Sequence, residues 1–272
     1  MPRKTAPFNF ESAPEQRSLT AKPGGILLAE LFHASGCAAA ADAIGVRSSR
    51  GYSDADHVLS SVLLNALGFD AGDDLEQLRS DGALVSAVHL LNEHKGKERR
   101  TVNAFPSPSA FRAFLTDAGS TEERVRGFSG LCSVPVRCAQ EMKPQEKITV
   151  DMDATIIPTE RGDDVRCNYK GERSHMAFNS YVPELDMVVH SEFCPGNVSP
   201  RDDQLGLLRR TLSKLPGGVK EVETRIDSAG YCMDLIKYCC GGESPYGVIR
   251  FSISVPMYKA HREEIDRLSE QA

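Results

Sequence analysis

The sequence contains no apolar run long enough to cross a membrane. The longest candidate, residues 24–31, is far shorter than the roughly 20 residues that a membrane helix requires. The N-terminus begins with basic residues, but no apolar run ending at a small-residue cleavage site follows them, so no signal peptide is expected. We therefore expect a cytoplasmic protein that has no membrane partner.

The sequence also lacks the cysteine spacing of a metal site or a redox pair. None of the eight cysteines belongs to a CxxC pair. Cys239 and Cys240 are adjacent, which suits neither chelation nor an ordinary disulfide. We expect structural or buried thiols.

Several common catalytic motifs are missing as well. The chain contains no HExxH, no GxSxG, no phosphate-binding loop ending in GK[ST] and no GxGxxG. The seven histidines are scattered, so none is predicted to be a ligand or a base. Zinc-protease, serine-hydrolase, P-loop and dinucleotide-binding functions are therefore not expected.

The composition of the 272 residues is that of a globular protein. Apolar residues make up 40% and charged residues 26%, and the length suits one large domain or two smaller ones. The formal net charge of −6 weighs against an extended DNA-binding face. A global charge can nevertheless conceal a local basic stripe, and a metal site brings its own cations.

Four stretches of different character divide the chain. Residues 1–23 are polar with scattered prolines and are expected to form a flexible arm. Residues 24–118 carry helical apolar spacing and a helix cap at Ser53, with an acid three positions later. Residues 119–146 are mixed and are expected to connect two parts, and residues 147–272 alternate strands and helices.

The last stretch predicts an α/β domain. Its first strand shows period-two alternation around Val150, and turn residues separate it from further strands and helices. Strands are expected at 177–182, 185–193, 222–226 and 247–255, and helices after a cap at Ser199 and at 231–240. The order β-β-β-α-β-α-β is typical of an RNase H-like mixed sheet, here preceded by a mostly helical N-terminal region.

Three acids in this domain indicate its chemistry. Asp151 and Asp153 stand two positions apart on a strand, so their side chains point to the same face. Asp227 follows the strand 222–226, where loops gather and ligands bind. Carboxylates on neighbouring strands suit two Mg²⁺ ions for phosphoryl transfer. The alternatives are an edge strand whose acids face water and, for Asp227, a helix cap.

A phosphatase chemistry remains as a second interpretation. The DxDxT pattern after an apolar strand also resembles the first motif of haloacid-dehalogenase-type phosphatases, with Asp151 as nucleophile and Asp153 as acid–base partner. Thr224 or Ser228 and Lys237 could supply the later motifs of that family. No acidic pair follows on a further strand, so this interpretation ranks second.

Several spaced motifs resemble bacterial insertion-sequence transposases of the DDE class, in the group whose first motif reads DxDxT. The matching segments occur in the family's order: LGFD (67–70), residues 74–81, the helix at 105–115, DMDATIIPT (151–159), YKG (169–171), HSEFCPGN (190–197) and RIDSAGY (225–231). The last of these is similar to the family's RADSGF motif. A series of motifs in order is more specific than any one of them.

The resemblance implies an RNase H-like catalytic core that cuts and joins DNA strands during transposition. It implies Asp153 as the first metal ligand, with Asp151 as the alternative, and Asp227 as the second. Two Mg²⁺ ions, replaceable by Mn²⁺, would be the cofactors, and transposon terminal inverted repeats and target DNA would be the partners. The region 24–118 would bind DNA ends, and two copies would form a synaptic dimer on the bacterial nucleoid. The basic residues expected near DNA phosphates are Lys170, Arg201, Arg209, Arg210 and Arg225.

One part of the family pattern is missing. The family places a third acid, a glutamate, on a helix well after the fifth strand. Here the sequence ends within a helical pattern at 260–268, and Glu263, Glu264 and Glu270 come too early for that role. We therefore expect a C-terminally truncated copy whose cutting activity is in question, and a DNA-binding remnant without catalysis is a third interpretation.

Overall fold

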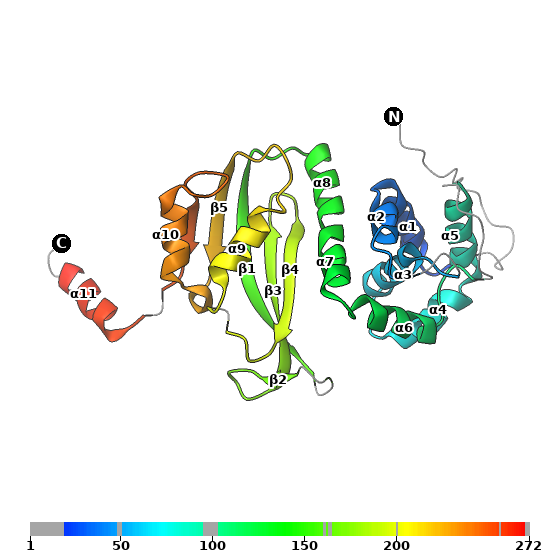
Figure 1. Cartoon of the computed structure of the whole chain (residues 1–272), viewed down its shortest axis with the longest axis horizontal. Helices are drawn as coiled ribbons and strands as arrows, with labels where there is room; N and C mark the ends of the chain where they lie inside the picture. Colours follow the sequence, from blue (N-terminus) through cyan, green and yellow to red (C-terminus); the bar gives the residue numbers. More distant parts are fainter. Residues whose placement is uncertain are drawn as a thin grey trace. The chain divides into compact units, whose positions relative to one another are not determined.

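The computed structural model describes residues 19–47, 51–94, 103–159, 162, 165–199, 201–255 and 257–269. The chain forms two compact units, Met1–Pro135 and Val136–Ala272 (Figure 1). Most of the predicted arm, residues 1–18, lies outside the described residues. None of the described helices is long and apolar enough to span a membrane.

The first unit is helical. Its α-helices are α1 (Pro23–Ala34), α2 (Cys37–Asp42), α3 (Asp54–Ala66), α4 (Leu75–Ser80), α5 (Gly82–His94), α6 (Pro108–Ala118) and α7 (Glu122–Leu131), with a 3₁₀ turn η2 (Gly72–Asp74) before α4. The predicted cap at Ser53 is confirmed: the Ser53 hydroxyl accepts from the Asp56 N–H, and the Asp56 carboxylate accepts from the Ser53 N–H. Leucines from α3, α4 and α5 form a fully buried core.

The segment 119–146, expected as a mixed connector, contains two helices. Helix α7 is followed by α8 (Ser133–Met142), which runs across the boundary between the two units. Thr121 caps α7 by accepting from the Arg124 N–H, and acids follow in the first turn. Helix α7 carries a narrow apolar stripe of Val125, Phe128 and Leu131, and none of its residues is fully buried.

The second unit is an α/β domain with a six-stranded mixed sheet. Its elements are β1 (Lys147–Pro158), β2 (Arg166–Cys167), β3 (Arg173–Val182), β4 (Met187–Pro195), α9 (Gln204–Leu212), β5 (Glu221–Ile226), η3 (Ser228–Gly230), α10 (Met233–Gly241), β6 (Arg250–Ile253) and α11 (Lys259–Ser269). Strand β1 is central, antiparallel to β3 and parallel to β5. Beyond them, β4 pairs with β3 and β6 pairs parallel with β5. The elements follow the predicted order with one addition, the two-residue β2.

Several element boundaries differ from the prediction. Strand β3 begins at Arg173 rather than at residue 177, because its pairing with β1 and β2 extends that far, and β4 covers Met187–Pro195 rather than 185–193. Helix α9 begins at Gln204 rather than after Ser199, because Ser199 instead opens a turn in which its carbonyl accepts from the Asp202 N–H. The last strand is shorter than 247–255, because Gly247 closes a turn with Ser244 before β6 begins.

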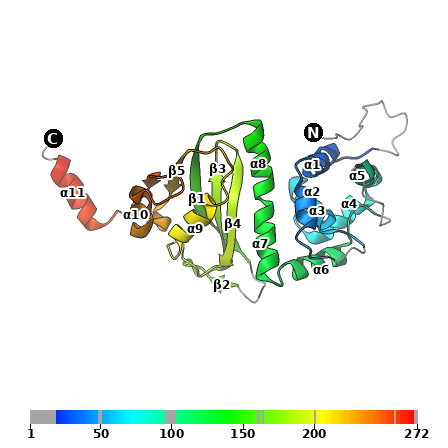
Figure 2. The same ribbon diagram turned by 45° about the horizontal axis from the view of Figure 1, so that its top comes forward.

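The two faces of the sheet differ in character. Ile148, Val150 and Met152 of β1 are buried in a core cluster that includes leucines of α9 and α10, so these helices cover one face. Figures 1 and 2 show α9 lying against the strands and α10 beside β5. The alternate residues of β1, including Asp151 and Asp153, point to the opposite face and are more exposed. We call this the acidic face.

Candidate active site

Asp153 and Asp227 each come directly after the last registered residue pair of the parallel strands β1 and β5. The β1–β5 register runs through Met152 and Ile226, so the next residue of each strand is one of the two acids. Asp227 keeps an extended backbone, with φ −75° and ψ 177°, which continues the alternation of β5. Neighbouring strands are about 4.8 Å apart. Both carboxylates are therefore at the acidic face, at the carboxyl end of β5.

Strand β1 is not an edge strand over Lys147–Met152, where β5 pairs with it on the side opposite β3. From Asp153 onward the registered partner is β3 alone. Asp153 is exposed. It makes no hydrogen bond or ion pair with any residue that the structure describes, so its carboxylate is available to an external cation.

The Asp227 carboxylate caps a turn with one oxygen and leaves its other oxygen without a hydrogen-bond partner among the described residues. One carboxylate oxygen, Oδ1, accepts from the N–H groups of Ala229 at 3.0 Å and Gly230 at 3.2 Å. It thereby caps the 3₁₀ turn η3, whereas Cys232 stands at the N-cap of α10. The second oxygen, Oδ2, has no such partner among the described residues. The cap thus fixes the carboxylate and leaves one oxygen for a ligand.

Asp151 is already engaged by a cation. Arg225 stands opposite it in the register, and its Nε and Nη2 donate to the two Asp151 oxygens at 2.5 Å each. This hydrogen bond and charge contact raise the pKa of Arg225 above its ordinary value. Between the two sequence candidates for the first metal ligand, Asp153 is the one left without a counter-charge among the described residues.

The five basic residues predicted near DNA are distributed over both sides of the sheet. Arg225 is bound by Asp151 on the acidic face. Arg209 and Arg210 belong to α9 on the opposite face, where the Arg209 guanidinium lies 4.7 Å from the Tyr238 ring centroid. Lys170 and Arg201 have no carboxylate partner among the described residues.

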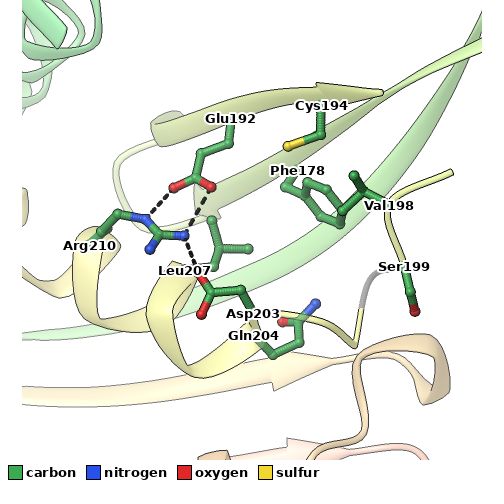
Figure 3. A pocket seen from close by; sticks show the side chains of 9 residues that line it. All are labelled: Phe178, Glu192, Cys194, Val198, Ser199, Asp203, Gln204, Leu207 and Arg210. Carbon is green, nitrogen blue, oxygen red and sulfur yellow. Dashed lines mark hydrogen bonds and ion pairs between the residues drawn. The ribbon is translucent and has the colours of Figure 1, made fainter. Parts of the chain in front are cut away.

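Arg210 is part of a polar network on the helix-covered face. It donates to both oxygens of Glu192, at 2.5 and 3.0 Å, and to Asp203 at 2.9 Å (Figure 3). These side chains line a small pocket of about 150 Å³ whose other walls include Phe178 and Leu207. Burial alone would raise the pKa of Glu192, but hydrogen bonds from Arg210 and His190 outweigh it and lower the pKa.

His190 extends this network to Lys214. The Lys214 ammonium can only donate, so at 2.7 Å it makes His190 Nδ1 an acceptor. Nε2–H then donates to Glu192, also at 2.7 Å, which defines a neutral imidazole. Burial lowers the pKa of His190 in agreement with that state. Sequence reasoning missed this network, although an acid at 192 on the core side of a strand was a signal for it.

Three motif segments converge on a larger hollow beside Asp227. It has a volume of about 560 Å³. Its lining comes from the loop after β2, the turn after β4 and the turn after β5: Cys167, Asn168, Tyr169, Gly196, Asn197, Val198, Ser199, Arg201 and Ala229. Ala229 donates its N–H to Asp227, so the hollow reaches the turn that Asp227 caps. Segments that resemble separate family motifs thus form one surface.

The donor set limits which metals the site suits. Within the described part of the chain, no group of three or more His, Cys, Asp or Glu side chains is arranged to hold a metal. Two carboxylates are nevertheless the usual protein share of a Mg²⁺ site, where water and substrate phosphate complete the shell. Oxygen ligands from Asp153 and Asp227 fit Mg²⁺ or Mn²⁺ shared with a bound phosphate.

The cysteines form no disulfide at this site, and Cys167 is the cysteine that lines the hollow. All eight lie within the described residues, and none forms a disulfide. Cys37 and Cys239 are buried, but Cys132, Cys167 and Cys240 are exposed, so burial holds for only some of the thiols. Burial raises the pKa of Cys239 to about 11, which keeps it protonated and unreactive.

No protein-family model and no curated protein matches this chain.

Proposed function

We propose that this chain is a DDE-type transposase whose RNase H-like core uses Asp153 and Asp227 to hold Mg²⁺ at a scissile DNA phosphate. The observation that carries the proposal is their adjacency: each follows the last registered pair of the parallel β1–β5 ladder, and both are on the acidic face. The motif segments that resemble this family also meet in one hollow beside Asp227.

The sheet supports the RNase H-like assignment. Strands β1, β3 and β4 form an antiparallel meander, and β5 and β6 then join parallel to β1 on its other side. This places β1 at the centre, so an acid near its middle and an acid at the end of β5 become neighbours. The observed order of strands and helices along the chain also agrees with the order that the sequence predicted.

In this proposal, Asp153, Asp227 and Arg225 have different roles at the scissile phosphate. Asp153 and the second oxygen of Asp227 would coordinate the metal, and η3 keeps Asp227 in position through two backbone N–H groups. Mg²⁺ held by these two carboxylates would activate a water or a 3′-hydroxyl as nucleophile and would stabilise the leaving oxygen. Arg225 neutralises Asp151, which limits the negative charge that an approaching phosphate meets.

Three observations count against the phosphatase alternative. Asp151 would be its nucleophile, but both of its oxygens accept from Arg225. The Thr224 hydroxyl donates to the Val150 carbonyl and is buried on the helix-covered face, away from Asp151. Lys237 is on α10, where its ammonium is 3.7 Å from Asp234.

The proposed partners are DNA ends and target DNA. The helical region 24–118 would hold the terminal repeats, and two copies would bring two ends together. A remnant that binds DNA without cutting it is the third interpretation.

Nicking of a supercoiled plasmid carrying the DNA that flanks the gene tests the proposal. Mg²⁺-dependent nicking that is lost in Asp153→Ala and in Asp227→Ala is the expected result. Asp234→Ala is the matched control, because this exposed acid is on α10. Retention of DNA without nicking by the wild type would favour the remnant, and phosphate release from a small ester with an adduct on Asp151 would favour the phosphatase.

A further inference from the structure

The hairpin between β2 and β3 carries an exposed aromatic side chain on a tip that its own hydrogen bonds close. Tyr169 is 79% exposed, whereas the neighbouring Asn168 is 6% exposed. Asn168 Oδ1 accepts from the N–H groups of Lys170 at 2.8 Å and Glu172 at 3.1 Å. Gly171 allows the tight return with a φ of +81°. The tip is therefore built by its own hydrogen bonds and loses little entropy when a ligand contacts it.

Tyr169 lines the hollow of about 560 Å³ described above. That volume is within the range of about 300–1,000 Å³ typical of ligand sites. Gly196 forms part of its wall where backbone segments pack closely: a Cβ there would be 2.5 Å from the Ser174 carbonyl oxygen and 2.7 Å from that of Arg166. The remaining polar lining includes Asn197 and Ser199.

Arg201, which lines this hollow, and Lys170, which follows Tyr169 in the chain, differ from Arg210 and Arg225. Arg210 and Arg225 are each held by carboxylates. Lys170 and Arg201 are not paired with any carboxylate that the structure describes. Lys170 Nζ is 5.6 Å from the Tyr169 ring centroid, and the Arg201 guanidinium is 3.5 Å from the Ser228 carbonyl oxygen. Both cations are therefore available to phosphate.

We propose that this hollow is a base-stacking subsite, in which an unpaired nucleobase of the DNA substrate stacks on Tyr169 while Lys170 and Arg201 contact the flanking phosphates. An exposed aromatic ring and cations without a carboxylate partner on one surface form the combination that binds single-stranded nucleic acid, because every base has a stacking face and every linkage carries a charge. The inference rests on the proposed function and specifies which form of DNA the site holds.

The hollow lies close to the proposed metal ligand Asp227, which suggests how base stacking would assist DNA cleavage. Ala229 lines the hollow and donates its N–H to Asp227, so the hollow that holds Tyr169 reaches the turn that Asp227 caps. Separating a base from its duplex partner beside the cleavage point frees the phosphate to approach the metal ligands. Stacking on Tyr169 offsets part of the unstacking energy.

Binding of single-stranded DNA in EDTA tests the subsite without any cleavage. The probe is a fluorescent eight-residue oligothymidylate, measured by anisotropy at low salt with the full chain. We expect Tyr169→Ala to weaken binding about 5- to 150-fold, the loss of one stacked base, and Tyr169→Phe to bind like the wild type. Tyr258→Ala removes another exposed tyrosine, outside the hollow, and is expected to leave binding unchanged.

A second measurement separates stacking from charge. Lys170→Ala and Arg201→Ala should each reduce the slope of log affinity against log salt by about 0.7, whereas Tyr169→Ala should leave that slope intact. A 5-bromodeoxyuridine version of the oligonucleotide should cross-link to the peptide that contains Tyr169. Because Tyr169 is largely exposed, thermal unfolding of Tyr169→Ala should match the wild type and exclude misfolding.

The outcomes distinguish this inference from the proposed function. Tyr169→Ala that binds within twofold of the wild type, or a cross-link that maps elsewhere, overturns the subsite even if the plasmid is nicked. Binding that depends on Tyr169 together with nicking that survives Asp153→Ala and Asp227→Ala supports the subsite and overturns the metal site.

Discussion

Arg225 and Asp151 face each other across the parallel β1–β5 pair and share two hydrogen bonds of 2.5 Å. Asp153 is two residues further along the same face, and no described residue pairs with it. Asp151 and Asp153 thus have different environments, although they belong to one motif and point to the same face of β1. One is neutralised within the protein, and the other is left for an external cation.

The first prediction separates these two acids. Asp153→Asn should lower the nicking rate by at least about a hundredfold, because a lost metal ligand removes several kcal/mol of transition-state stabilisation. Asp151→Asn should lower it less than about tenfold and should barely change the melting temperature, since exposed ion pairs contribute only about 0–1 kcal/mol. Single-turnover nicking in Mg²⁺ measures both. An Asp151→Asn variant as inactive as Asp153→Asn would contradict the assignment.

The second prediction concerns the turn after β4. Gly196→Ala should lower the free energy of unfolding by about 1–3 kcal/mol, because the added Cβ meets the backbone carbonyl oxygens of Ser174 and Arg166. Gly217→Ala is the matched control, since a Cβ there meets nothing within 4 Å. Urea denaturation measures both variants. Equal stability of the two would show that the turn can open at no cost.

The third prediction concerns Arg210. Arg210→Ala should destabilise the fold by about 1–3 kcal/mol, because it leaves the half-buried Glu192 carboxylate without its main donor. The control is Lys220→Ala, which breaks an exposed pair with Glu146 and should cost at most about 1 kcal/mol. Oligonucleotide affinity should be unchanged in Arg210→Ala under folding conditions. A lower affinity with unchanged stability would instead assign Arg210 to DNA binding.

The fourth prediction is a pH dependence in the helical unit. Burial, together with the charge of Arg47, lowers the pKa of His57 from 6.5 to about 4. The folded state therefore keeps His57 neutral while the unfolded chain takes up a proton below about pH 6.5. Stability from this group is full above about pH 6.5 and is lost as the pH falls toward about 4.

Urea denaturation at pH 7, 5.5 and 4.5 checks this. The free energy of unfolding should fall more steeply with acid in the wild type than in His57→Phe, which keeps an aromatic ring against Phe114. Parallel curves for the two proteins would contradict the prediction, because they would show that His57 takes up its proton at the same pH in the folded and unfolded states.

Much of the fold could be predicted because local patterns decide it. The alternation around Val150 fixed which side of β1 is buried, and the capping residues at Ser53 marked the start of α3. Helix α7 was not predicted because its apolar stripe, Val125, Phe128 and Leu131, is narrow and none of its residues is fully buried. Ser199 misled because the residues of a turn and of a helix cap are the same kinds of residue.

The site was predictable only in part, because strand register is a non-local property. Asp153 and Asp227 were expected to meet from their positions at the ends of strand patterns. The Asp151–Arg225 pair depends on which residue of β5 lies opposite which residue of β1, and no local pattern states that. The hollow at Tyr169 likewise exists only because the loops after β2, β4 and β5 fold to the same place.

A change of metal specificity tests the central claim most directly. Asp153→Cys and Asp227→Cys each replace a carboxylate oxygen by a softer sulfur ligand, which Mg²⁺ accepts poorly and Mn²⁺ accepts better. The account predicts that both variants fail to nick the plasmid in Mg²⁺ and recover nicking in Mn²⁺, whereas the wild type nicks with either ion. Variants that nick in Mg²⁺ as fast as the wild type would contradict it.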